Sequence, residues 1–264
     1  MTGGIELKSN EGTTQGDHIG MAVYAIGIKP LLNMLLSTKA DIQDQMAAFA
    51  DDKTSVGKLL SLRWWRTQIT TIGPHYGYFP QPTKSWLIVK ENHYEEAKAV
   101  FEVTNIQISK IGERHLGAVI GSKSFRERYC KEVIERWSYE LTTLSEIALT
   151  RPQAAYACYK SGYQHRFSYF LRTIPEMCVY LQPIEKIIRH QFIPAITDGK
   201  IINDLERNLL SLLPHMAVLG LKNVCQIAPI KHENSKHFTK HLQNMIFNLP
   251  PPDETKTKTK SAIK

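Results

Sequence analysis

Two adjacent carboxylates, Asp51 and Asp52, are the residues of this sequence whose types and spacing most clearly point to chemistry. An apolar run, 46–49, precedes them and a short strand-like run, 54–56, follows, which predicts a tight β-hairpin with both acids at its tip. Mg²⁺ would relieve the repulsion between them, and it leaves coordination positions for substrate phosphates. Two such ions can align a hydroxyl with a phosphate. The alternative is a solvated Asp-Asp turn that holds no metal.

A second motif, EGTTQGD at residues 11–17, precedes the first expected helix. Gly16 allows backbone to approach a ligand closely, and the Gln15 amide can both donate to and accept from a base or sugar edge. The start of a helix also favours anions. The alternative is a loop that ends in a helix cap at Asp17.

Taken together and in order, four motifs resemble successive motifs of a reverse transcriptase palm, and the likeness is closest to the polymerases of eukaryotic retrotransposons. They are EGTTQGD at 11–17, FADD at 49–52, GYFP at 77–80 with TKSWLIV at 83–89, and HLG at 115–117. The runs at 151–156 and 172–175 also look like the helical region behind such palms. The resemblance spans about residues 5–247.

The resemblance implies a role for each matching residue. It implies nucleotide and template binding for Gln15, Gly16 and Phe49, metal binding for Asp51 and Asp52, contact with the nucleotide's phosphates for Lys84, and a primer grip for His115, Leu116 and Gly117.

The implied reaction is RNA-templated DNA synthesis, in which a primer 3′-hydroxyl attacks the α-phosphate of a deoxynucleotide and pyrophosphate leaves. The implied cofactor is Mg²⁺ or Mn²⁺, and the implied partners are an RNA template, a DNA primer and a dNTP. Catalysis of this kind rests on positioning and on charge neutralisation by two metal ions.

Three departures from the family pattern affect this expectation. The family places a further metal-binding aspartate on a strand upstream of the Gln-Gly motif, whereas no aspartate precedes Asp17 here. His18 stands where the family usually has proline, and Phe49 replaces a usual tyrosine. We therefore expect the fingers and the first aspartate strand to be missing and the isolated chain to be inactive.

Two weaker patterns also suggest chemistry. His237 and His241 are four apart near Cys225 and His232, but no Cys-x-x-Cys pair is present and the spacing fits no usual zinc site, so no zinc is expected. Aromatic residues interleaved with bases could instead line a nucleic-acid groove, or they could be core tyrosines with exposed tips. These residues are Tyr156, Tyr159, Lys160, Tyr163, His165, Arg166 and Tyr169.

The positive charge of the chain lies entirely in its second half. Residues 1–121 carry 12 basic and 12 acidic side chains, and residues 122–264 carry 21 basic and 13 acidic ones. A one-sided positive field suits a polyanion such as nucleic acid, although it also keeps a domain soluble. Four scattered cysteines and the lack of a secretory leader predict an intracellular protein, cytoplasmic or nuclear.

The elements expected around these motifs define an α+β protein. Strands and helices alternate through 1–121, which we interpret as a partial palm, a small antiparallel sheet with helices. Helices are expected over 57–71, with a stop at Gly73-Pro74, and over 92–103, with Ala97, Val100 and Phe101 inward, and further strands over 85–89, 105–109 and 116–120.

Residues 122–249 read as a mainly α-helical thumb or connection region, and 250–264 as a disordered lysine-rich tail. Spacing of three and four residues predicts one long helix with an apolar stripe of Phe125, Tyr129, Val133, Trp137, Leu141, Leu144 and Ile147. A second helix is expected from a cap at Thr150 to about Arg172, and further helices over 175–196, 203–213 and about 231–247.

The apolar stretch 19–36 predicts a buried helix with a break at Pro30, rather than a membrane span. Its expected inward residues are Ile19, Val23, Ile26 and Leu31 or Leu32.

Three hypotheses remain open on the sequence alone. The chain is a polymerase fragment that lacks part of its site, a nucleic-acid-binding protein without catalysis, or a decayed retroelement product without a selected role. The sequence does not determine the oligomeric state.

Overall fold

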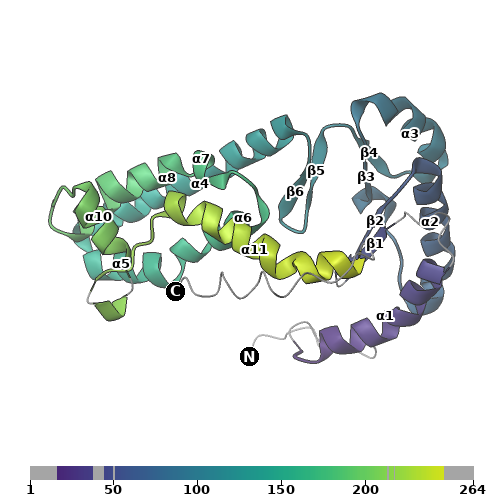
Figure 1. Cartoon of the computed structure of the whole chain (residues 1–264), viewed down its shortest axis with the longest axis horizontal. Coiled ribbons are helices and arrows are strands. Elements are labelled where there is room, and N and C mark those ends of the chain that lie inside the picture. The colour runs from purple at the N-terminus through teal and green to yellow at the C-terminus, as the bar shows by residue number, and fades with distance from the viewer. Residues whose placement is uncertain (1–16, 38–44, 50, 213, 217, 247–264) are drawn as a thin grey trace, which may run out of the picture. The chain divides into compact units, whose positions relative to one another are not determined.

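The computed structural model describes residues 17–37, 45–49, 51–212, 214–216 and 218–246. The chain is mainly helical, with small antiparallel and parallel sheets, and therefore belongs to the α+β class (Figure 1). It forms two compact units, which are described separately. Unit 1 contains the described residues up to Leu87 together with Asn92–Ile108, and unit 2 contains Ile88–Glu91 and Ser109–Met245. Gln15, Gly16 and the tail expected at 250–264 lie outside the described residues.

Unit 1 contains a β-hairpin between helices. Its elements are α1 (Gly20–Ser37), β1 (Gln45–Phe49), β2 (Asp52–Val56), α2 (Leu59–Ile72) and α3 (Tyr94–Phe101). The predicted hairpin is confirmed, since β1 and β2 pair antiparallel from Gln45 opposite Val56 to Phe49 opposite Asp52. The predicted stop of α2 is also confirmed, because Gly73 caps it and a 3₁₀ turn, Gly73–Tyr76, follows with Pro74 in it.

The predictions for α1 are partly wrong. The helix continues through Pro30 without the expected break. Ile28, Leu31 and Leu35 face inward and pack with Ile69 of α2. The expected burial is confirmed for Leu31, whereas Ile19, Val23 and Ile26, which were also expected inward, are at least half exposed. The sequence offers apolar residues around most of this helix, so only the position of α2 decides which stripe is buried.

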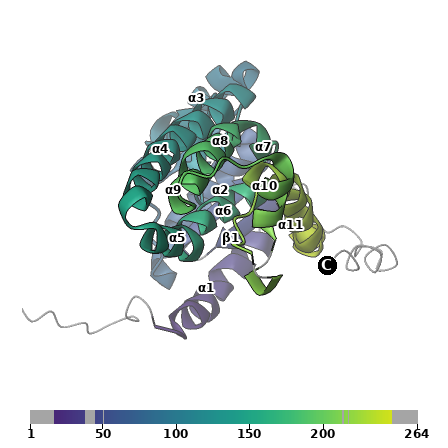
Figure 2. The ribbon, with the colours of Figure 1, turned by 90° about the vertical axis from the view of Figure 1, so that its left-hand side faces the viewer.

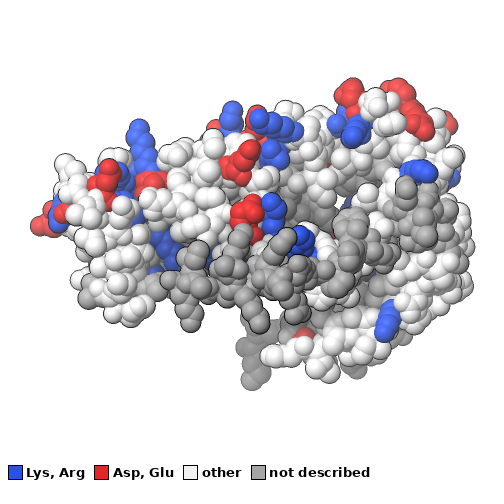
Figure 3. All heavy atoms as spheres, viewed as in Figure 1, with Lys and Arg blue, Asp and Glu red and all other residues white. Residues whose placement is uncertain are grey.

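Helix α1 is long and apolar enough, by length and composition alone, to cross a membrane, and 22% of its window is buried. The surface over α1 is largely uncharged on the face shown in Figure 3. The expectation that the chain has no membrane partner stays a prediction.

A short parallel pair of strands, β3 (Trp86–Ile88) and β4 (Gln107–Ser109), follows in the chain. The backbone N–H of Gln107 donates to the Ser85 carbonyl, and the backbone N–H of Val89 donates to the Ser109 carbonyl, each at 3.0 Å. Both strands lie within stretches where strands were expected. Helix α3 buries Ala97 and Phe101, as its periodicity predicted.

Unit 2 begins with a second hairpin, β5 (Gly112–His115) and β6 (Ala118–Gly121), whose strands pair antiparallel. A strand was expected over 116–120, but Leu116 and Gly117 form the turn instead and β5 was not foreseen. Both turn residues have positive φ, 49° and 78°, which is typical of the tight two-residue turns that match the twist of paired strands.

The rest of unit 2 consists of helices packed around one long helix, α4 (Figure 2). They are α4 (Lys123–Thr150), α5 (Pro152–Ser161), α6 (Phe167–Thr173), α7 (Met177–Tyr180), α8 (Gln182–Ile187), α9 (Ile193–Ile196), α10 (Asp204–Ser211) and α11 (Val224–Ile246). The Ser122 side chain caps α4 by accepting from the Phe125 amide. The predicted apolar stripe of α4 is confirmed over Val133, Trp137 and Leu141, which are buried in the main core.

Several helix boundaries differ from the prediction. Thr150 does not cap α5, because it is the last residue of α4 and Arg151 occupies the cap position. The helix expected to reach Arg172 is interrupted after Gly162, and a π-helical turn, Ile188–Phe192, joins α8 to α9. Helix α11 starts at Val224, seven residues earlier than expected.

Candidate functional site

The two carboxylates lie at the tip of the hairpin in unit 1, as the sequence predicted. Asp52 is the first residue of β2 and pairs with Phe49, and Asp51 lies in the turn that joins the strands. Both side chains are exposed, and so is the Phe49 ring, at 67%. The Phe49 ring is therefore accessible to a ligand.

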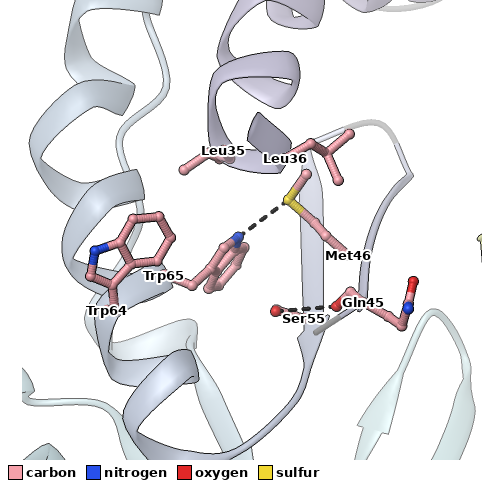
Figure 4. A pocket seen from close by; sticks show the side chains of 7 residues that line it. All are labelled: Leu35, Leu36, Gln45, Met46, Ser55, Trp64 and Trp65. Carbon is pink, nitrogen blue, oxygen red and sulfur yellow. Dashed lines mark hydrogen bonds between the residues drawn. The ribbon is translucent and has the colours of Figure 1, made fainter. Parts of the chain in front are cut away.

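The base of this hairpin is fixed to α1 and α2 (Figure 4). The Trp65 indole Nε1 donates to the Met46 Sδ at 3.2 Å, and the Ser55 hydroxyl donates to the Gln45 carbonyl at the same distance. The cavity enclosed among these side chains has a volume of only about 10 Å³. That volume is close to the minimum for a single water, so this seam anchors the hairpin rather than binding a substrate.

Near the tip, Lys53 connects the hairpin to two tyrosines. Its Nζ lies 3.3 Å from the Tyr24 hydroxyl of α1, 5.3 Å from the centre of the Tyr24 ring and 4.8 Å from that of Tyr78. The charge of Asp51 acts on all three groups. Burial raises the pKa of Tyr24, and the negative charge of Asp51 adds a smaller contribution in the same direction. The negative charge of Asp51 is therefore felt by a tyrosine of α1.

The pKa values of the other two groups show the same surroundings. Burial raises the pKa of Tyr78 to about 12, with smaller contributions from Tyr24, Asp51 and Asp52 in the same direction. Burial lowers the pKa of the Lys53 ammonium, and the charges of Asp51 and Asp52 oppose that shift. The sequence motifs alone did not reveal this aromatic and cationic surrounding, although a lysine directly after two acids was a visible signal.

Of the other residues proposed for this site, Gln15 and Gly16 lie outside the described residues, and Lys84 is not paired with the carboxylates. Lys84 ends an exposed 3₁₀ turn, Pro82–Lys84, and forms no ion pair with Asp51 or Asp52 within the described residues. Within that same part of the chain, no group of three or more His, Cys, Asp and Glu is arranged to hold a metal ion. The two aspartates do present hard oxygen donors of the kind that Mg²⁺ takes, and Mg²⁺ usually keeps waters and substrate phosphates for the rest of its shell.

In unit 2, the turn predicted to form a primer grip is fixed by two tyrosines. The Tyr169 hydroxyl of α6 donates to the Leu116 carbonyl, and the Tyr129 hydroxyl of α4 donates to the Gly117 carbonyl at 3.4 Å. A Cβ on Gly117 would meet the Tyr169 ring at 3.4 Å. His115 is the last residue of β5, and this turn is thus held firmly on the helices beneath it.

The aromatic and basic run at 156–169 does not form a single groove. Tyr159 and Tyr163 are core residues, and the Tyr163 hydroxyl donates to the Trp137 carbonyl. Arg166 pairs with Glu140. The core-tyrosine alternative therefore applies to the middle of the run, because helical periodicity turns those rings toward α4.

A different set of bases gathers on unit 2. The Lys160 Nζ donates to the Gly220 carbonyl at 2.9 Å, and Lys222 lies two residues further on. Burial lowers the pKa of Lys160, and the positive charge of Lys222 lowers it further. Burial also lowers the pKa of Lys231, with smaller contributions from the charges of Lys222 and Arg172. We call Lys160, Arg172, Lys222 and Lys231 the basic cluster. None of these four bases forms an ion pair with another described residue.

Comparisons with models of protein families, with curated proteins and with solved structures found no match for this chain. The likeness to reverse transcriptases therefore rests on the sequence motifs quoted above.

Proposed function

We propose that this chain is part of a reverse transcriptase of eukaryotic retrotransposon type and that the hairpin of unit 1 carries metal ligands for RNA-templated DNA synthesis. The position of Asp51 and Asp52 carries the proposal. Both are exposed at the turn of a hairpin whose base is anchored on two helices. Adjacent, solvent-accessible carboxylates on a firmly held turn are suited to binding a hard cation.

Bound Mg²⁺ or Mn²⁺ would supply Lewis-acid chemistry at the transferred phosphate. The chain's own contribution is to hold the ligands still. The anchored hairpin base limits the motion of Asp51 and Asp52, and the exposed Phe49 ring beside them offers a surface on which a base can stack. In this proposal Lys84 reaches the nucleotide's phosphates only once the nucleotide is bound.

A Mn²⁺ titration of the full chain, followed by the electron paramagnetic resonance of the free ion, tests this proposal. We expect Asp51→Asn with Asp52→Asn to weaken binding at least tenfold. The matched control is Glu95→Gln with Glu96→Gln, which removes another adjacent and exposed pair of acids from α3 of the same unit. Equal losses in the two double variants would show nonspecific binding and contradict the proposal.

A primer-extension assay addresses catalysis separately. We expect no extension of a DNA primer on an RNA template by this 264-residue polypeptide, because the bridging aspartate that the family uses has no counterpart before Asp17. Extension by the original chain that is lost when Asp51 and Asp52 are replaced would show that these residues suffice, and this expectation would then be wrong.

The basic cluster favours a second candidate, a nucleic-acid-binding protein without catalysis. Its four cations repel one another and have no acidic partner in the described part of the chain, so phosphates would stabilise them. Each phosphate neutralised contributes about −0.9 to the slope of log affinity against log salt on duplex DNA. Binding of this kind needs neither Asp51 nor Asp52. The two candidates are therefore separable in one set of variants.

Filter binding of an RNA–DNA duplex at several salt concentrations tests the second candidate. We expect replacement of the basic cluster by glutamine to weaken binding and to flatten the salt slope by about 0.9 for each phosphate that is no longer neutralised. The matched control replaces three lysines and one arginine of unit 2 that already have acidic partners. They are Lys123, Arg128, Lys200 and Lys236. Equal effects of the two fourfold variants would refute a site at the basic cluster.

A further inference from the structure

Lys53 occupies an unusual place beside the two carboxylates. It directly follows Asp52 in β2 and pairs across the hairpin with Ala48. Its side chain is only partly exposed, whereas those of Asp51 and Asp52 are exposed. A lysine at an exposed hairpin tip normally extends into water, so the burial of this one requires a physical reason.

Two tyrosines from other elements provide that reason. The Lys53 Nζ lies close to the Tyr24 hydroxyl and within 5.3 Å of the centres of both the Tyr24 and the Tyr78 rings. Cation–π contacts contribute about 0.5–2 kcal/mol each, depending on exposure. Contacts with α1 and with the segment after α2 therefore hold the ammonium in place on the hairpin that carries the acids, where the charges of Asp51 and Asp52 act on it.

We propose that Lys53 is an internal counter-ion of the Asp51–Asp52 pair, held in place by Tyr24 and Tyr78, and that its fixed charge weakens the binding of a divalent cation at the hairpin tip. This inference rests on the proposed metal-binding role of the two aspartates. Lys53 is a positioning and tuning residue in this scheme, since it touches neither substrate nor metal. A purely structural clamp is the competing explanation.

The two explanations differ in their dependence on charge. A fixed positive charge roughly 4 to 12 Å from a dication lowers the affinity by roughly three- to thirtyfold at the dielectric constant of water, which applies because the hairpin tip is exposed. Salt screens this effect, with a Debye length of about 30 Å at 0.01 M and about 3 Å at 1 M. A structural clamp predicts the opposite direction, because loosening the hairpin would weaken metal binding at every salt concentration.

The experiment is a Mn²⁺ titration of the full chain at low and high salt. We expect Lys53→Met, which keeps an unbranched stem, to bind Mn²⁺ roughly three- to thirtyfold more tightly at low salt, with the gain disappearing near 1 M salt. Lys53→Arg should bind like the original chain. The matched control is Lys98→Met, because Lys98 also lies over a tyrosine, with its Nζ 4.4 Å from the centre of the Tyr94 ring on α3.

Each other outcome overturns the inference in a recognisable way. If Lys53→Met binds Mn²⁺ no more tightly, or if Lys98→Met gives the same gain, Lys53 is not the counter-ion. The Lys53→Met chain is then combined with Asp51→Asn and Asp52→Asn. If the triple variant still binds Mn²⁺ as the original chain does, the proposed metal site is contradicted as well. If Mn²⁺ binding is lost with the two aspartates but does not depend on residue 53, only the present inference is overturned.

Discussion

Arg207 should be among the most sensitive positions of unit 2. Its side chain is only 3% exposed, and it donates to both carboxylate oxygens of Glu185, at 2.6 and 3.0 Å. It also donates to the carbonyls of Leu221, at 2.6 Å, and Lys222, at 3.4 Å. This one guanidinium therefore joins α10 to α8 and to the segment that carries Lys222 of the basic cluster.

Replacing Arg207 with methionine leaves the Glu185 carboxylate, whose side chain is 13% exposed, without its partner. Breaking one side of a buried ion pair typically costs about 3–5 kcal/mol. We therefore expect a loss of about 3–5 kcal/mol at pH 7.

Urea unfolding followed by far-UV circular dichroism measures this loss. With a slope of about 2 kcal/mol per molar urea, the midpoint should fall by about 1.5–2.5 M. The control is Glu185→Met with Arg207→Met, which removes both charges and should cost clearly less, because apolar replacement of a whole buried pair is often close to neutral. A single variant that loses less than about 1 kcal/mol, or a double variant as unstable as the single one, would refute this reasoning.

Three further outcomes are expected. Gly117→Ala should lower the free energy of unfolding by about 1–2 kcal/mol because of the φ of 78° at this position. Gly121→Ala should lower it more, because the added Cβ would lie 2.3 Å from the backbone of the opposite strand. Urea unfolding of the two variants checks this order. The raised pKa of Tyr78, about 12 against an ordinary 10.0, predicts that the folded state keeps this proton longer than the unfolded chain does. The free energy of unfolding of unit 1 should therefore fall between pH 10 and pH 12, by up to about 1.4 kcal/mol per pH unit, and Tyr78→Phe should remove that fall in urea titrations at several pH values. Burial raises the pKa of Cys225 to about 11, so mass spectrometry after brief maleimide treatment at pH 7.5 should find the exposed Cys158 modified before Cys225.

The local patterns of the sequence determined the elements that carry the candidate site. Two short strand-like runs on either side of Asp51 and Asp52 were enough to predict the hairpin, because strands joined by a short polar turn pair within a dozen residues. The end of α2 at Gly73 was predictable for a similar reason, since glycine followed directly by proline is a local stop signal for a helix. Spacing of three and four residues likewise identified the buried stripe of α4.

Tertiary structure alone decided which of these surfaces are exposed and which residues meet. The inward stripe of α1 depends on where α2 lies, and the burial of Tyr159 and Tyr163 depends on the helices around them. Lys53 meets Tyr24 and Tyr78 across 29 and 25 positions of the sequence. Hydrophobic periodicity gives each helix a side but no partner, because burial is a property of packed surfaces that are brought together from distant parts of the chain.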